Sequence, residues 1–195
     1  EKFPFINVIE RKPDDKNLSF GSSWLHQDTS YLANDRPRYT MLMGIEIPNG
    51  QGNTIFSSGF NAYEKLPDEV KDKIKDATGI FSSAGPISVT RLEREKEMGI
   101  KSSKSMEAEH PIVKKVNGKK TLYVSPGHLM AIKNVDKKDA DYLKSYLIEH
   151  VNKKEFIFSY EWSKGDICLW DNLSILHMAS EIKNCRRVMH RITIK

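Results

Sequence analysis

The sequence predicts a mainly β fold with flanking helices (α+β), arranged as a sandwich or jelly roll. Two observations support this fold class. Many short runs rich in β-branched and aromatic residues are separated by turn clusters, and only two segments have the character of helices. No internal repeat or low-complexity segment interrupts this pattern.

The strands are predicted from apolar runs and from alternation. Residues 39–47 form a nearly continuous apolar run, which is typical of a strand buried on both faces. A turn cluster at 48–53 leads into a short strand at 54–57. Residues 156–162 alternate aromatic and other side chains with the period of two that a half-buried strand requires. Further strands are expected at 121–125, 167–170, 175–179 and 187–194.

Two helical segments are predicted between the strands. Residues 61–77 form the first, with a second helical segment starting after a break at Pro67. Residues 136–150 form the other, with Asp136 as the expected N-cap and Leu143 and Leu147 on its apolar face. Residues 87–109 are highly charged with weak periodicity, and they are a candidate lid loop.

Length and composition indicate one ordinary domain. The chain has 195 residues, of which 38% are hydrophobic and 29% are charged, and no apolar stretch approaches the roughly 20 residues that cross a bilayer. No secretory signal is visible at the start. The two cysteines are expected to be reduced thiols, so a cytoplasmic location without membrane attachment is predicted.

The net charge of +5 comes mostly from dispersed lysines. Acidic residues are interleaved among them, whereas a nucleic-acid surface would gather arginines and aromatics on one element. We therefore expect a small-molecule substrate and no nucleic-acid partner, and a homo-oligomer stays open. A positive field would help to attract small anions.

Three residues have the pattern of a metal site. His26 and Asp28 are two positions apart, so an extended backbone points both side chains to the same side. His177 lies in an apolar strand and supplies the third candidate ligand. Two imidazoles and one carboxylate are the ligand set of non-haem Fe(II) oxygenases, although zinc accepts the same set. Taken singly, each motif is more often structural.

Two arginines follow on one strand face. Arg187, Met189, Arg191 and Thr193 alternate with Val188, His190, Ile192 and Ile194. Four residues at about 3.3 Å each place the two arginine Cα atoms roughly 13 Å apart, which suits two anionic groups on either side of a metal. A guanidinium matches the planar geometry of a carboxylate. For the strand alone, two solvated arginines remain the simpler interpretation.

Taken together, these motifs resemble the TauD/TfdA-type Fe(II)/2-oxoglutarate-dependent dioxygenases. The resemblance extends over nearly the whole chain from Trp24 onward. It is carried by the segments 24–31, 39–56, 61–64, 110–113, 122–124, 165–172, His177 and 187–191.

The resemblance implies a single double-stranded β-helix domain (jelly-roll, cupin-like) over residues 1–195, lacking the family's N-terminal segment. It implies that His26, Asp28 and His177 bind Fe(II), and that Thr54 and Arg187 bind the co-substrate 2-oxoglutarate. Arg191 would meet a substrate anion. Thr29 and Tyr31 would line the substrate pocket, and Trp170 would form an aromatic wall near the iron.

The activity implied by the resemblance is hydroxylation with O2, which releases succinate and CO2. A sulfonate, sulfate ester or carboxylic acid is the expected substrate. The alternatives are a butyrobetaine-hydroxylase-like enzyme acting on a quaternary amine, a nucleic-acid or protein demethylase, and a relative that binds a small acid without turnover.

Overall fold

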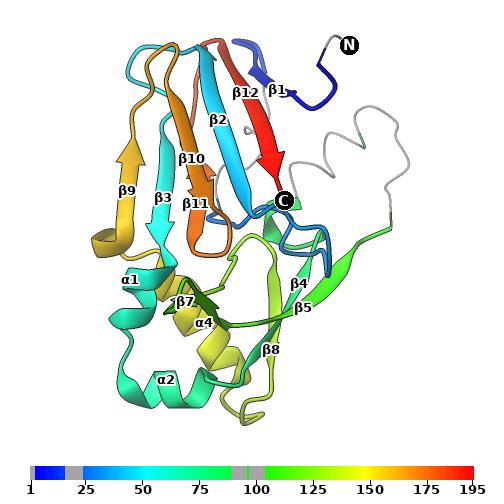
Figure 1. Cartoon of the computed structure of the whole chain (residues 1–195), viewed down its shortest axis with the longest axis vertical. Coiled ribbons are helices and arrows are strands. Elements are labelled where there is room, and N and C mark those ends of the chain that lie inside the picture. The colour runs from blue at the N-terminus through cyan, green and yellow to red at the C-terminus, as the bar shows by residue number, and fades with distance from the viewer. Residues whose placement is uncertain (1–2, 16–23, 89–95, 97–103) are drawn as a thin grey trace.

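The computed structural model describes residues 3–15, 24–88, 96 and 104–195. Its upper part consists of antiparallel strands, and its lower part contains the helices and a smaller sheet (Figure 1). The mainly β fold with flanking helices predicted from the sequence is therefore present. In the part of the chain that is described, no helix is long and apolar enough to span a bilayer.

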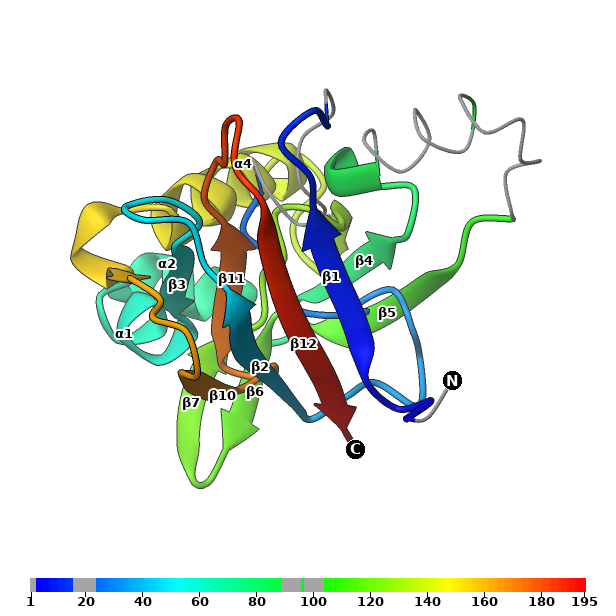
Figure 2. The same ribbon diagram turned by 90° about the horizontal axis from the view of Figure 1, so that it is seen from above.

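A four-stranded antiparallel sheet carries one wall of the site. Its order is β1-β12-β2-β10. The bounds are Asn7–Arg11 for β1, Arg187–Ile194 for β12, Tyr39–Glu46 for β2 and Ile167–Asp171 for β10. Figure 2 shows β1 beside β12 from above. Strand β1 was not predicted, because its short sequence is mostly polar.

Strand β2 is buried on one face only, which corrects the prediction of burial on both faces. Thr40, Leu42 and Gly44 face inward, whereas Tyr39 and Met43 are 36% and 37% exposed. The apolar run did not predict the burial of β2 correctly, because the exposed outer face of this sheet also carries apolar side chains. The alternation of burial nevertheless fixes which residues face the site.

A second sheet faces the first across a small core. Its order is β11-β3-β9, with bounds Ile175–Ala179, Thr54–Ser58 and Ile157–Tyr160. The rings of Phe56 on β3 and Trp170 on β10 lie 5.3 Å apart and join the two sheets. Leu42, Trp162 and Met189 complete this cluster.

The lower part is a separate layer of helices and short strands. It contains α1 (Gly59–Glu64), α2 (Asp68–Ile74), α4 (Ala140–Val151), η1 (Pro86–Ser88), η2 (Lys154–Phe156), β4 (Thr78–Ser82), β5 (Glu107–Pro111), β6 (Val113–Val116), β7 (Lys119–Leu122) and β8 (Leu129–Lys133). The sheet order here is β5-β4-β8, and β6 and β7 form a hairpin. Asn117 and Gly118 connect the hairpin with positive φ angles of 49° and 83°, as a two-residue Asn-Gly turn requires.

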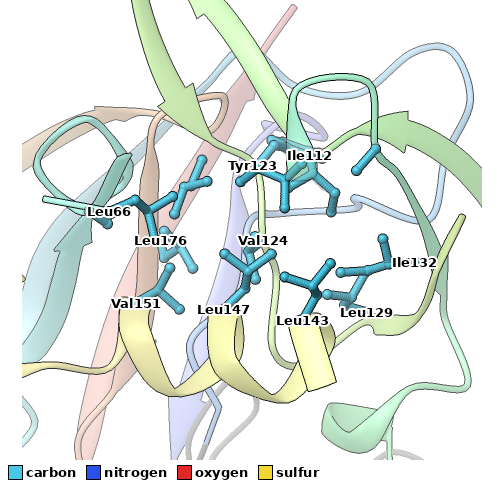
Figure 3. Close-up of a cluster of buried hydrophobic side chains, with 14 of the residues drawn as sticks. Leu66, Ile112, Tyr123, Val124, Leu129, Ile132, Leu143, Leu147, Val151 and Leu176 are labelled. Carbon is cyan, nitrogen blue, oxygen red and sulfur yellow. The ribbon is translucent and has the colours of Figure 1, made fainter. Parts of the chain in front are cut away.

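The main hydrophobic core lies between α4 and these strands. Leu143, Leu147 and Val151 of α4 are fully buried and point toward Tyr123, Ile112 and Leu176 (Figure 3). The predicted apolar face of this helix is thus confirmed for Leu143 and Leu147. Leu25 and Leu176, the neighbours of two candidate metal ligands, belong to the same cluster.

Several element boundaries differ from the prediction. The last helix has Asp139, not Asp136, as its N-cap, because residues 136–139 form a turn. The predicted strand at 121–125 ends at Leu122, and the helix break at Pro67 is confirmed. Of the candidate lid at 87–109, residues 89–95 and 97–103 lie outside the described part, and its ends belong to η1 and β5.

Candidate metal centre

The backbones of two candidate ligands pair directly with each other. The His26 N–H donates to the carbonyl of His177 at 3.0 Å, and the His177 N–H donates to the carbonyl of His26 at 2.9 Å. This isolated antiparallel bridge joins the segment before Asp28 to β11. The two imidazole ring centroids consequently lie 4.4 Å apart.

Asp28 completes a compact group of three. Its Oδ1 lies 3.8 Å from His26 Nε2 and 3.7 Å from His177 Nε2. All three residues are buried, and one ligand atom from each lies within 4.8 Å of the others. The structure therefore brings together the predicted triad, and the spacing of His26 and Asp28 places both side chains on one side.

The protonation states suit metal binding. Burial, followed by the neighbouring His26, lowers the pKa of His177 to about 3, and burial also lowers the pKa of His26. Burial raises the pKa of Asp28, but His177, Arg191, His26 and a hydrogen bond from Thr40 outweigh it and bring the pKa to about 2. Near neutral pH the centre thus offers two neutral imidazoles and one carboxylate.

The ring of His26 is oriented for coordination through Nε2. Its Nδ1 lies 3.0 Å from the carbonyl of Trp24 and donates to it, which leaves the Nε2 lone pair free. His177 Nδ1 is buried without a hydrogen-bond partner in the described structure, whereas its Nε2 faces Asp28. This donor set fits a divalent metal with an open face, including Fe(II).

A pocket opens beside the triad. It offers about 470 Å³ of space, part of which is open to solvent, and its wall includes His26, His177, Trp170, Arg187 and Arg191. Both arginines and Met189 face this pocket from β12, so the predicted alternation of that strand is confirmed. The Trp170 ring lies 4.6 Å from the His177 ring, at the predicted place of an aromatic wall.

Arg187 is a buried cation with unused donors. It is 6% exposed, and its Nε and Nη2 have no hydrogen-bond partner among the described residues. Burial lowers its pKa to about 10. Gly52 makes room for it, because a Cβ at that position would lie 2.8 Å from Arg187 Cδ. Such a site suits a carboxylate that can accept from the guanidinium.

Thr54 lines the same pocket from β3. The indole N–H of Trp162 donates to its Oγ1 at 2.9 Å. The Thr54 hydroxyl hydrogen is therefore available to a second acceptor in the pocket. Thr54 and Arg187 thus line the same pocket, and their predicted contact with 2-oxoglutarate stays a prediction.

Arg191 lies closer to the triad than the sequence suggested. Its Nη1 is 3.6 Å from Asp28 Oδ1, and its Nε has no hydrogen-bond partner in the described structure. Its side chain is 22% exposed. Arg191 thus combines contact with the candidate ligand and partial access to solvent.

Thr29 and Tyr31 are not part of this pocket wall. Thr29 adopts a positive φ of 49° in the turn that follows Asp28. The half-buried Tyr31 ring packs edge-on against His128, with centroids 5.1 Å apart. Their predicted contact with substrate stays a prediction.

Sequence reasoning missed two polar residues beside Asp28. Thr40 donates to Asp28 Oδ2 at 2.6 Å, and the Asn172 amide donates to Thr40 Oγ1 at 2.7 Å. Thr40 belongs to an apolar run and has no motif of its own. Asn172 lies in a motif that carries the family resemblance, but nothing in the sequence indicated its partner.

Comparison with known proteins identifies the family of the chain. Residues 2–193 match the model of the family described as "Taurine catabolism dioxygenase TauD, TfdA family". The chain is 30% identical over 192 residues to an alkylsulfatase of Acinetobacter baylyi, covering 93% of this chain and 59% of the relative. It is 26% identical over 184 residues to an alpha-ketoglutarate-dependent sulfate ester dioxygenase of Pseudomonas putida, covering 89% and 59%.

A solved structure shows the same architecture. A taurine dioxygenase from Burkholderia xenovorans superposes with a TM-score of 0.76 at 25% identity, covering 98% of this chain and 61% of that one. This likeness confirms the predicted jelly roll. The chain spans 59% of the length of the two curated relatives described above. The match over almost its full length shows that the chain belongs to the TauD/TfdA family of dioxygenases.

Proposed function

We propose that this chain is an Fe(II)/2-oxoglutarate-dependent dioxygenase that hydroxylates a small anionic substrate and releases succinate and CO2. A sulfonate, a sulfate ester or a carboxylic acid is the proposed substrate class. The observation that carries the proposal is the pocket shared by the histidine pair and Arg187. His26 and His177, two of the three candidate metal ligands, line this pocket. The buried guanidinium of Arg187 lines it as well, and its Nε and Nη2 have no partner in the described structure.

The triad and the arginine have distinct roles in this proposal. His26, Asp28 and His177 would bind Fe(II) from one side and leave its opposite side open. Arg187 and Thr54 would hold the far carboxylate of 2-oxoglutarate. Bound iron, with 2-oxoglutarate and O2, would supply the oxidising power, and the protein's part is positioning and exclusion of water.

Burial of the site residues limits the access of water to the candidate metal site. The three residues of the triad and Arg187 are buried, and Trp170 and Met189 line the pocket as well. Apolar walls of this kind limit side reactions with solvent once substrates fill the space.

Arg191 supports an anionic substrate. It lines the same pocket, and its partly exposed guanidinium retains a free Nε–H in the described structure. Two relatives are named for sulfate ester chemistry. Hydroxylation of the carbon that carries a sulfate ester oxygen would give an unstable product, which would collapse to an aldehyde and sulfate.

A quaternary amine is less compatible with this pocket. Arg187 and Arg191 would both repel a cation, and a methylammonium site would need an aromatic cage. The two arginines therefore favour an anionic substrate over a quaternary amine.

The test is succinate release by the 195-residue chain with Fe(II), ascorbate and 2-oxoglutarate. An alkyl sulfate, an alkyl sulfonate, an aryloxy acid and a betaine are compared as substrates. We expect turnover with at least one anion and none with the betaine. Loss of turnover in Arg187→Gln but not in Arg186→Gln, whose exposed side chain pairs with Glu10 and Glu46, would support the assigned role. If none of the three anionic substrates gives succinate release, the proposed substrate class is wrong.

The role of Arg191 is tested separately. Arg191→Ala is expected to raise the KM for the anionic substrate while 2-oxoglutarate binding changes little. An unchanged KM would remove Arg191 from substrate recognition.

A further inference from the structure

A line of three hydrogen bonds ends on one oxygen of Asp28. Trp170 Nε1 lies 3.1 Å from Asn172 Oδ1, Asn172 Nδ2 lies 2.7 Å from Thr40 Oγ1, and Thr40 Oγ1 lies 2.6 Å from Asp28 Oδ2. The other oxygen, Oδ1, is the one that faces both histidines. The two oxygens of this carboxylate therefore have different partners.

The chemistry of the donors fixes the direction of every bond in this line. An indole N–H can only donate, so Asn172 must turn its carbonyl oxygen toward Trp170. Its NH2 group then points at Thr40 and can only donate as well. The Thr40 oxygen accepts that hydrogen, and its own hydrogen is directed to Asp28 Oδ2.

Burial and backbone pairing hold this arrangement in place. Thr40 is fully buried, and Asn172 and Trp170 are 2% and 6% exposed. Thr40 and Trp170 are direct partners in the pairing of β2 with β10. The backbone N–H of Asn172 also donates to the carbonyl of Arg38 at 2.8 Å. Water therefore has little access to replace the hydroxyl.

We propose that Thr40 and Asn172 are positioning residues that restrict Asp28 to a single ligand oxygen, so that a coordination position stays open for 2-oxoglutarate. This inference rests on the proposed function. A carboxylate can bind a metal through one or both oxygens. With Oδ2 held by Thr40, only Oδ1 is available to the metal.

Removal of the Thr40 hydroxyl would change how Asp28 binds a metal. Without it, Oδ2 becomes a buried acceptor that lacks a strong partner, and such an acceptor is costly. A metal bound at Oδ1 would be the nearest replacement. Asp28 would then bind through both oxygens and compete with the co-substrate, while the metal would lose no protein ligand.

The test compares Thr40→Val, which removes the hydroxyl at similar shape, with Thr40→Ser, which retains it. Co(II) serves as the metal probe. Its affinity is measured by calorimetry, and 2-oxoglutarate binding is followed by the visible absorption of the Co(II)-loaded protein. We expect Thr40→Val to bind Co(II) within about threefold of wild type but 2-oxoglutarate about tenfold more weakly. Thr40→Ser should restore most of that affinity.

A second variant tests the same series of hydrogen bonds at Asn172. Asn172→Ser removes the amide that orients the Thr40 hydroxyl, so 2-oxoglutarate binding should again weaken more than Co(II) binding. It also tests the inference if Thr40→Val does not fold.

Two outcomes would overturn the inference. One is a Thr40→Val protein that binds 2-oxoglutarate like wild type. The other is a parallel loss of Co(II) and 2-oxoglutarate, which would indicate a purely structural role. A wild-type chain that binds Co(II) but not 2-oxoglutarate would instead contradict the proposed function, and the inference with it.

Discussion

His26 and His177 exchange both of their backbone hydrogen bonds, at 3.0 and 2.9 Å. The bridge fixes the separation of two imidazoles that are far apart in the chain, before any metal binds. A metal should therefore bind the folded protein and stabilise it, because the unfolded chain has no such arrangement.

The first prediction concerns thermal stability with Co(II). At a Co(II) concentration about 100 times the Kd, the wild-type protein should gain about 2.7 kcal/mol, seen as a raised Tm in calorimetry. His177→Ala should show no such gain. His190→Ala, a half-buried histidine outside the triad, is the matched control and should respond like wild type. A Co(II)-dependent Tm in His177→Ala would argue against the triad.

Two members of the triad, His26 and Asp28, could be proposed from sequence because their signal is local. The i, i+2 spacing of His26 and Asp28 depends only on extended backbone, and the alternation on β12 places Arg187 and Arg191 together in the same way. His177 needed the resemblance as well, because a histidine in an apolar strand has several interpretations.

The supporting residues could not be predicted because their partners are distant in sequence. Asn172, which directly follows β10, reaches Thr40 only once β2 pairs with β10. The exposure of Met43 likewise depends on what covers the outer face of the sheet, and an apolar run does not reveal that. Strand β1 became recognisable only through its pairing with β12.

The second prediction is that Arg187 lowers the stability of the ligand-free protein. A buried guanidinium without partners for Nε and Nη2 in the described structure carries a desolvation cost. Arg187→Met should therefore raise the free energy of unfolding by about 1–2 kcal/mol in urea titrations without 2-oxoglutarate. The same variant should lose 2-oxoglutarate binding.

Arg186→Met is the control for this change. Arg186 is exposed and ion-paired, so its loss should alter stability by less than about 0.5 kcal/mol. If Arg187→Met were less stable than wild type, the view of Arg187 as an uncompensated buried charge would be wrong.

The third prediction concerns acid stability through His110. Burial, followed by the charges of Arg36 and Lys114, lowers the pKa of His110 to about 4 from 6.5. Between pH 4 and pH 6.5, His110 therefore binds a proton in the unfolded chain but not in the folded chain. The stability contributed by neutral His110 is therefore complete above pH 6.5 and is lost as the pH falls toward 4.

Urea midpoints measured between pH 7.5 and 4.5 test this dependence. His110→Asn removes the titrating group and keeps a donor for the carbonyl of Leu32, which His110 Nε2 contacts at 3.0 Å. The variant should lose less stability on acidification than wild type does. Equal losses in both proteins would assign the acid sensitivity to other groups.

The fourth prediction separates core packing from metal-ligand placement. Leu147 of α4 and Leu176 of β11 are both fully buried in one cluster, so either alanine variant should cost about 2–5 kcal/mol in urea unfolding. Only Leu176 neighbours a ligand, His177, and so only Leu176→Ala should also weaken Co(II) binding, measured by calorimetry under folding conditions. Tyr142→Ala, at a side chain that is 61% exposed on α4, should change stability by less than about 0.5 kcal/mol. Equal Co(II) affinity in the two leucine variants would mean that the bridge to His26 holds His177 without support from the core.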